Sequence, residues 1–203
     1  MSGVLAWALV ATGLAVVIVR RRSVAVALVT AQAFLLAGVA FAEGAGGDDI
    51  GAALALALRG VVLATLFLAL VARTREPRPV RAGVAPLVRA GAAVVLALGL
   101  TWLIPVIGLE SRDAERAVLA LVAFGLAASA TRRATLFQVL GIVLVENGLA
   151  LAALELPGSA SLAIEIGVAV DLLLVAVVAS VFHERIFAEF GAGDATVLRS
   201  LRD

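Results

Sequence analysis

The chain has 203 residues, of which 63% are hydrophobic and only 15% are charged. Soluble globular domains are about 45–50% apolar, so a mean hydropathy of +1.14 excludes an ordinary soluble protein and indicates an integral membrane protein. There is no cysteine and only one histidine, which excludes disulfides and thiolate metal sites. We therefore expect neither a metal nor a cofactor in this chain.

Seven apolar runs separate the charged clusters and predict an all-α, multi-pass bundle of seven transmembrane helices. The runs are Gly3 to Val19, Val24 to Phe41, Ile50 to Ala72, Leu87 to Ile104, Ala117 to Ala130, Ala134 to Leu156 and Leu162 to Phe182. A helix needs roughly 17–25 residues to cross about 30 Å of hydrocarbon. The fifth run is short and suffices only if its helix begins near Glu115.

Fourteen of the sixteen arginines fall in alternate loops or the tail, twelve on one side and two on the other. The first side holds Arg20, Arg21, Arg22, Arg73, Arg75, Arg78, Arg81, Arg132, Arg133, Arg185, Arg199 and Arg202, and the second holds Arg112 and Arg116. Cytoplasmic loops carry the excess of basic residues, so the N-terminus is predicted outside and the C-terminus in the cytoplasm. Arginine without lysine is typical of a GC-rich bacterial genome, which indicates a bacterial inner membrane.

The chain is expected to form one membrane domain with an internal boundary at the proline-containing loop from Arg73 to Pro86. This boundary divides the chain into an N-terminal three-helix half (1–76), a connecting helix with its loops (77–114), a C-terminal three-helix half (115–185) and a cytoplasmic tail (186–203). The tail either lies on the membrane surface or is frayed. One hypothesis makes the first half a copy of the last, with Gln32 and Arg59 in the places of Glu146 and Asp171.

Two carboxylates, Glu146 and Asp171, lie deep in the sixth and seventh runs. A charge at the bilayer centre costs roughly 2.5–3.5 kcal/mol, and both acids lie about 20 Å from the arginine-rich edge on antiparallel helices. They are either stations of one proton path or neutral acids hydrogen-bonded between helices. Glu155 and Glu165 lie nearer the outer surface, where ordinary interfacial residues are expected.

The spans contain other polar residues. Arg59 requires a counter-ion or a wet cavity because a guanidinium stays charged, and the acids at its depth are Glu146 and Asp171. Gln32 and Gln138 are expected to form interhelical hydrogen bonds. His183, at the cytoplasmic end of the seventh run, is either a solvated interface residue, which we favour, or a proton relay toward Asp171.

The stretch from Arg132 to Ile186 resembles the membrane component E of hydrogenase-4 and formate hydrogenlyase-type complexes, and through that family the small K subunit of respiratory complex I. The likeness rests on paired arginines before the sixth run, a glutamate followed by asparagine within it, and an acid twelve residues before a histidine in the seventh. The K subunit has a glutamate where this chain has Asp171, and its first glutamate lies about one helical turn nearer the arginines than Glu146 does.

The resemblance implies a non-redox subunit without activity of its own in a complex I-like or group 4 [NiFe]-hydrogenase-like assembly. Glu146 and Asp171 would then form a proton pathway, with Fe–S clusters and a NiFe centre in partner subunits. The expected partners are antiporter-like and quinone-site-like membrane subunits and a peripheral electron-transfer arm. The alternatives are a subunit of a cation/proton antiporter or a structural anchor. No nucleotide-binding or nucleic-acid-binding motif is present.

Overall fold

The computed structural model describes residues 3–43, 47–74, 84–109, 111–156, 175–177, 179–185 and 187–188. These residues form an all-α structure. Its helices are α1 (Gly3–Ile18), α2 (Arg22–Glu43), α3 (Gly47–Thr74), α4 (Pro86–Leu103), α5 (Arg112–Thr131) and α6 (Thr135–Glu155). Residues 175–177 and 179–185 are helical too, but most of the seventh apolar run lies outside the described residues.

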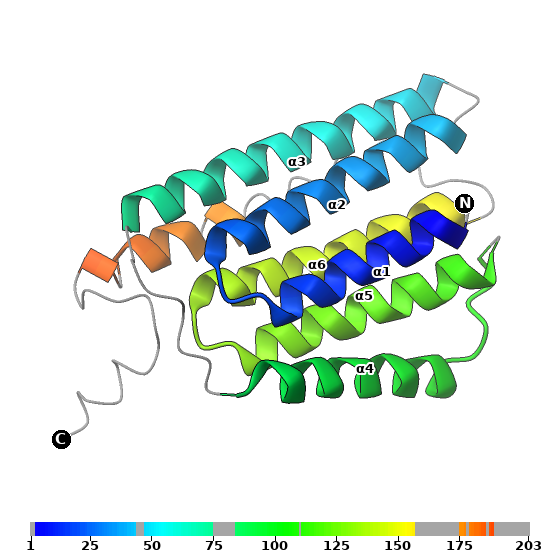
Figure 1. Cartoon of the computed structure of the whole chain (residues 1–203). Coiled ribbons are helices and arrows are strands. Elements are labelled where there is room, and N and C mark those ends of the chain that lie inside the picture. The colour runs from blue at the N-terminus through cyan, green and yellow to red at the C-terminus, as the bar shows by residue number, and fades with distance from the viewer. Residues whose placement is uncertain are drawn as a thin grey trace.

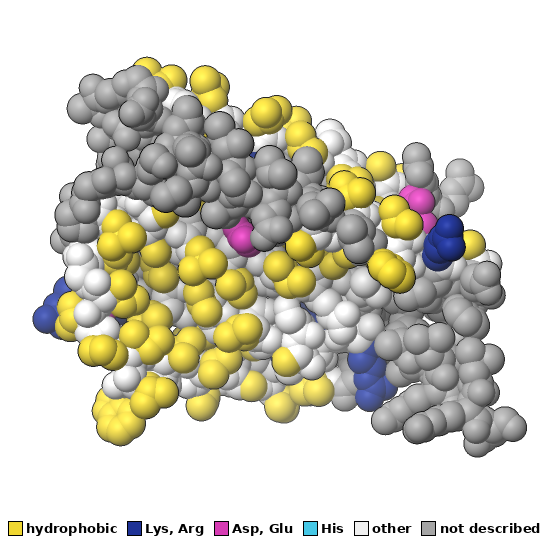
Figure 2. Space-filling view, turned by 180° about the vertical axis from the view of Figure 1, so that it is seen from behind, with side chains coloured by type: hydrophobic (Ala, Val, Ile, Leu, Met, Phe, Trp, Pro, Cys, Tyr) yellow, Lys and Arg dark blue, Asp and Glu magenta, His cyan; other side chains and the backbone are white. Residues whose placement is uncertain are grey.

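Five of the described helices are long and apolar enough to cross a membrane. These candidate spans are Arg22–Ala42, Ala53–Ala72, Pro86–Leu103, Arg112–Thr131 and Thr135–Glu155, and α1 is a shorter apolar helix. Figure 2 shows one face of the molecule. Hydrophobic side chains are spread over its middle, and the most prominent arginine side chains lie toward its two ends. The prediction of an all-α bundle is therefore confirmed for the described residues, with five helices that could cross a membrane.

The bundle has α1, α2, α5 and α6 at its centre and α3 and α4 at its flanks (Figure 1). Helix α2 packs on α1, α3 and α6, and α5 packs on α1, α4 and α6. Successive helices alternate in direction, so α1, α3 and α5 begin at the end of the bundle where α2, α4 and α6 finish. This end is the outer one in the predicted topology, and we call the opposite end the arginine-rich end.

Helix α5 is longer than the apolar run that predicted it, because its first turn is polar. Ser111 caps this helix by accepting a hydrogen bond from the backbone N–H of Ala114 at 3.0 Å, as Ser does at helix N-termini. Asp113 and Glu115 follow in the first turn, where negative charge is favourable. The expected extension to Glu115 is thus confirmed and goes one turn further.

Helices α5 and α6 approach each other closely at two glycines. A Cβ atom on Gly125 would overlap the carbonyl oxygen of Gly141, and one on Gly141 would lie 2.7 Å from the carbonyl oxygen of Gly125. Small residues at membrane helix interfaces permit such backbone approach. This contact fixes α6, which carries Glu146, against the centre of the bundle.

At the arginine-rich end, two buried arginines cover the C-terminus of α1. Arg89 Nε donates to the Val17 carbonyl at 2.8 Å, and Arg132 Nη2 donates to the same carbonyl at 2.9 Å and to that of Val19. The last carbonyls of a helix have no intrahelical donor, and positive charge is favourable beside them. Arginine side chains from α4 and from the α5–α6 turn therefore satisfy the end of α1.

Arg132 is held in this position by its surroundings. Its guanidinium carbon lies 4.0 Å from the centroid of the Phe137 ring, a cation–π distance. Burial, followed by the charges of Arg89 and Arg20, lowers the pKa of Arg132 to about 9. The guanidinium accordingly remains positive near pH 7 and continues to neutralise the helix end.

Candidate polar site inside the helix bundle

An arginine and a glutamate from different helices meet inside the bundle. Arg59 Nη1 on α3 lies 3.7 Å from Glu146 Oε2 on α6, with side-chain exposures of 2% and 17%. Charge-assisted N–H···O bonds are about 2.7–2.9 Å long, so the pair is electrostatic rather than directly hydrogen-bonded. Glu146 is therefore the counter-ion of Arg59 among the described residues.

The direct hydrogen bond of Arg59 goes to the neighbour of Glu146. Arg59 Nη2 donates to Asn147 Oδ1, and Asn147 Nδ2 donates to Gln32 Oε1 at 3.2 Å. Asn147 and Gln32 are both fully buried. Adjacent positions of α6 thus bind one guanidinium by two means, through charge at Glu146 and through a neutral hydrogen bond at Asn147.

Gln32 continues this chain of polar contacts to α1. Its Nε2 donates to the Leu9 carbonyl at 2.9 Å and to Thr12 Oγ1 at 3.1 Å. The expected interhelical hydrogen bonds of Gln32 are therefore confirmed. Side chains of four helices, α1, α2, α3 and α6, form one connected polar network, which we call the central network (Thr12, Gln32, Arg59, Glu146 and Asn147).

The central network lies near the middle of the bundle. At 1.5 Å of rise per residue, Arg59 is about 22 Å from the end of α3 at Thr74, and Asn147 is about 18 Å from the start of α6. In hydrocarbon about 30 Å thick, both positions are far from the arginine-rich surface. The cost of charge at this depth explains why each residue of the network contacts a polar side chain of another helix.

A small cavity adjoins the central network on the side toward the arginine-rich end. It has a volume of about 10 Å³ and lies between α2, α3 and α6, with Thr30, Phe67 and Asn147 in its wall. That volume is about the minimum for one water molecule, which also needs at least two polar partners. The Thr30 hydroxyl and the Asn147 amide are polar groups in this wall.

Other predicted residues have different surroundings. Gln138 Nε2 donates to the Arg132 carbonyl at 2.9 Å, so its interhelical bond joins α5 to α6 at the arginine-rich end rather than in the core.

Glu155 and His183 are almost fully buried, which differs from the solvated interface positions expected for both. Asp171 and Glu165 lie outside the described residues. No group of three or more metal-ligating side chains occurs in the described part of the chain.

Three residues that make buried polar contacts between helices were not predicted from the sequence. Asn147 was noted only as part of the resemblance, although an amide beside a buried acid is itself a sign of a polar contact. Arg89 is near the start of the fourth apolar run and is completely buried, which its position three residues from Pro86 did not suggest. Thr12 was hidden because Thr in a membrane helix usually bonds its own preceding turn, as Thr12 also does to Ala8.

Comparison with known proteins identifies one relative. The chain is 32% identical over 160 residues to a protein of Mycobacterium tuberculosis described as "Uncharacterized protein Rv0085", and the match covers 73% of this chain and 70% of the relative. No family model and no solved structure matches the chain. The length and identity of the match show that the chain belongs to the same family as this uncharacterized mycobacterial protein.

Proposed function

We propose that this chain is a non-redox membrane subunit of a complex I-like or group 4 [NiFe]-hydrogenase-like assembly, in which Glu146 and Asp171 conduct protons. The observation that carries the proposal is the contact of Glu146 with Arg59 inside the bundle, at 3.7 Å. Ionisable residues at such depth usually belong to ion or proton pathways. The resemblance of the C-terminal half to the component E and K subunit families supports the same role.

The central network supplies groups that such a pathway requires. Glu146 would take up and release the proton, and Arg59, 3.7 Å away, would be the counter-ion of its carboxylate. The hydrogen bond of Arg59 to Asn147 holds the guanidinium on α6 when the carboxylate is neutral. A structural ion pair alone does not require this second, uncharged attachment.

The cavity beside Asn147 supports a route toward the arginine-rich end. One water bound there would join Asn147 to Thr30, which is nearer that end on α2. The proposed topology has seven helices with the N-terminus outside, in a bacterial inner membrane, so this end would face the cytoplasm. His183, buried near the same end, is the proposed relay toward Asp171.

The proposed partners are antiporter-like and quinone-site-like membrane subunits and a peripheral arm with Fe–S clusters and a NiFe centre. The first test is purification of the native complex through an affinity tag on this chain, followed by identification of the co-purifying subunits. A hydrogenase-like or complex I-like set supports the proposal. Recovery of antiporter subunits alone would instead assign the chain to a cation/proton antiporter.

The second test measures proton translocation by the complex in inverted membrane vesicles. Glu146→Gln and Asp171→Asn should leave the complex assembled and strongly reduce the pH gradient formed per electron transferred. Glu155→Gln is the control, because Glu155 is a buried acid on the same helix as Glu146 but not part of the central network. Normal translocation in both pathway variants would make the chain a structural anchor.

A further inference from the structure

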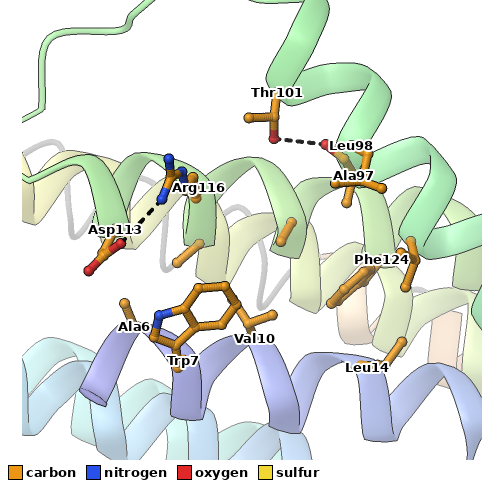
Figure 3. A pocket seen from close by; sticks show the side chains of 13 residues that line it. Ala6, Trp7, Val10, Leu14, Ala97, Leu98, Thr101, Asp113, Arg116 and Phe124 are labelled. Carbon is orange, nitrogen blue, oxygen red and sulfur yellow. Dashed lines mark hydrogen bonds and ion pairs between the residues drawn. The ribbon is translucent and has the colours of Figure 1, made fainter. Parts of the chain in front are cut away.

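An apolar groove opens between α1 and α4, with α5 as its floor (Figure 3). It has a volume of about 410 Å³, and its wall is almost wholly apolar. Small residues form much of the wall, including Ala97 on α4 and Ala117 and Ala120 on α5. None of these residues belongs to the central network, so the groove is independent of the proposed proton path.

The length of the groove matches one leaflet of a bilayer. It extends from Ala6 to Leu14 along α1 and from Asp113 to Phe124 along α5, which at 1.5 Å per residue is about 12 Å and 16 Å. The hydrocarbon core is about 30 Å thick, so the groove covers about half of it. A single acyl chain of one leaflet has this length, whereas a transmembrane helix of a partner needs the full thickness.

The polar end of the groove contains one cation and one anion. Arg116 Nη1 and Asp113 Oδ1 lie 3.7 Å apart on the first turns of α5, and their side chains are 56% and 43% exposed. Figure 3 shows both at the same end of the groove, near Trp7 of α1. Tryptophan is enriched at the level of lipid headgroups, so this end lies where a headgroup would be.

We propose that the groove binds one zwitterionic phospholipid of the phosphatidylethanolamine type. One acyl chain fills the groove, the headgroup phosphate accepts from Arg116, and the headgroup ammonium donates to Asp113. The pair of opposite charges complements a headgroup that itself carries both charges. Phosphatidylglycerol has no ammonium for Asp113, and the quaternary ammonium of phosphatidylcholine cannot donate a hydrogen bond.

The two tryptophans of the chain provide matched reporters for this proposal. Trp7 lines the groove, whereas Trp102 is outside its wall and 88% exposed. In the full chain reconstituted in vesicles, Trp102→Phe leaves Trp7 as the fluorophore and Trp7→Phe leaves Trp102. Phosphatidylethanolamine with brominated acyl chains quenches a tryptophan that it contacts, and its competition with unbrominated lipids gives relative binding constants.

The binding constants measured from Trp7 quenching should favour phosphatidylethanolamine over phosphatidylcholine and phosphatidylglycerol by about two- to fivefold. This is the range of single exposed ion pairs. Trp102 should show no preference. Arg116→Gln and Asp113→Asn should each abolish the preference at Trp7, and Ala120→Leu should weaken quenching by every lipid because it fills the groove. Arg112→Gln is the control, since Arg112 is an exposed neighbour outside the groove.

Equal quenching of Trp7 by all three lipids, unchanged in Arg116→Gln and Asp113→Asn, would overturn the proposal. Protection of Trp7 from every brominated lipid would also overturn it, because a protein segment would then occupy the groove. Arg116 is exposed and Asp113 is half-buried, so their variants should fold even if Ala120→Leu does not.

Discussion

The Arg59 guanidinium lies 3.7 Å from the Glu146 carboxylate, although the two residues are on α3 and α6 and neither helix is the principal neighbour of the other. Arg59 reaches α6 beside α2, which packs on both helices. Gly60, the next residue on α3, lies against Ala33 of α2, where a Cβ atom would be 3.0 Å from the Ala33 Cβ. This close packing brings the guanidinium within reach of Glu146.

Arg59→Ala should destabilise the purified chain by about 3–5 kcal/mol, because removal of one partner leaves the other charge buried. Arg59→Ala combined with Glu146→Gln should recover much of this loss, since the remaining side chain is then neutral. Thermal unfolding in detergent, followed by circular dichroism, measures both variants. Equal losses in the single and double variants would show that Glu146 does not depend on Arg59.

Gln32→Leu should cost about 0.6–1.7 kcal/mol, the range measured for hydrogen bonds between membrane helices. Asn147→Leu should cost more, because it also removes the hydrogen bond of the buried Arg59 guanidinium. Because the two amides bond each other at 3.2 Å, the double variant should lose less than the sum of the single losses. The same unfolding measurement tests this difference. Gln138→Leu is the control and should add fully to Asn147→Leu, since Gln138 bonds the Arg132 carbonyl instead.

The sequence predicted the membrane class and most helices because lipid imposes long apolar runs and excludes charge. The depth of each residue within its apolar run also limited the candidate counter-ions of Arg59 to two acids, Glu146 and Asp171. The sequence could not choose between them, because depth does not say which faces of α3 and α6 meet. The burial of Arg89 was equally hidden, since its partner carbonyls are on α1, 72 positions earlier for the bond to Val17.

Arg89→Gln and Arg132→Gln should each destabilise the chain by about 1–3 kcal/mol, because each removes one of the two arginines that donate to the carbonyls at the end of α1. Arg133→Gln should have little effect, as Arg133 is adjacent in sequence but exposed. The unfolding midpoints of the three variants, measured at equal ionic strength, test this difference in stability. A loss in Arg133→Gln as large as in Arg132→Gln would indicate that overall charge, rather than contact with α1, stabilises this end.

Gly141→Ala and Gly99→Ala should change stability in opposite directions, although each adds one methyl group to a helix interior. The Gly141 methyl would lie 2.7 Å from the Gly125 carbonyl oxygen, and such overpacking costs about 1–3 kcal/mol. Gly99 on α4 has nothing within 4 Å of its added Cβ, so the substitution should gain about 0.5–1 kcal/mol of backbone entropy. Thermal unfolding of both variants in the same detergent measures the signs.

The Gly141 substitution should also affect the central network. Glu146 follows Gly141 by five residues, about 7.5 Å along α6, so separation of α6 from α5 would move the carboxylate relative to Arg59. Gly141→Ala should therefore make the loss caused by Arg59→Ala smaller than it is in the unmodified chain. If that loss is unchanged, α6 has adapted locally and the α5–α6 contact does not position Glu146.

If Gly141→Ala is as stable as Gly99→Ala, the two helices are not held together at these glycines.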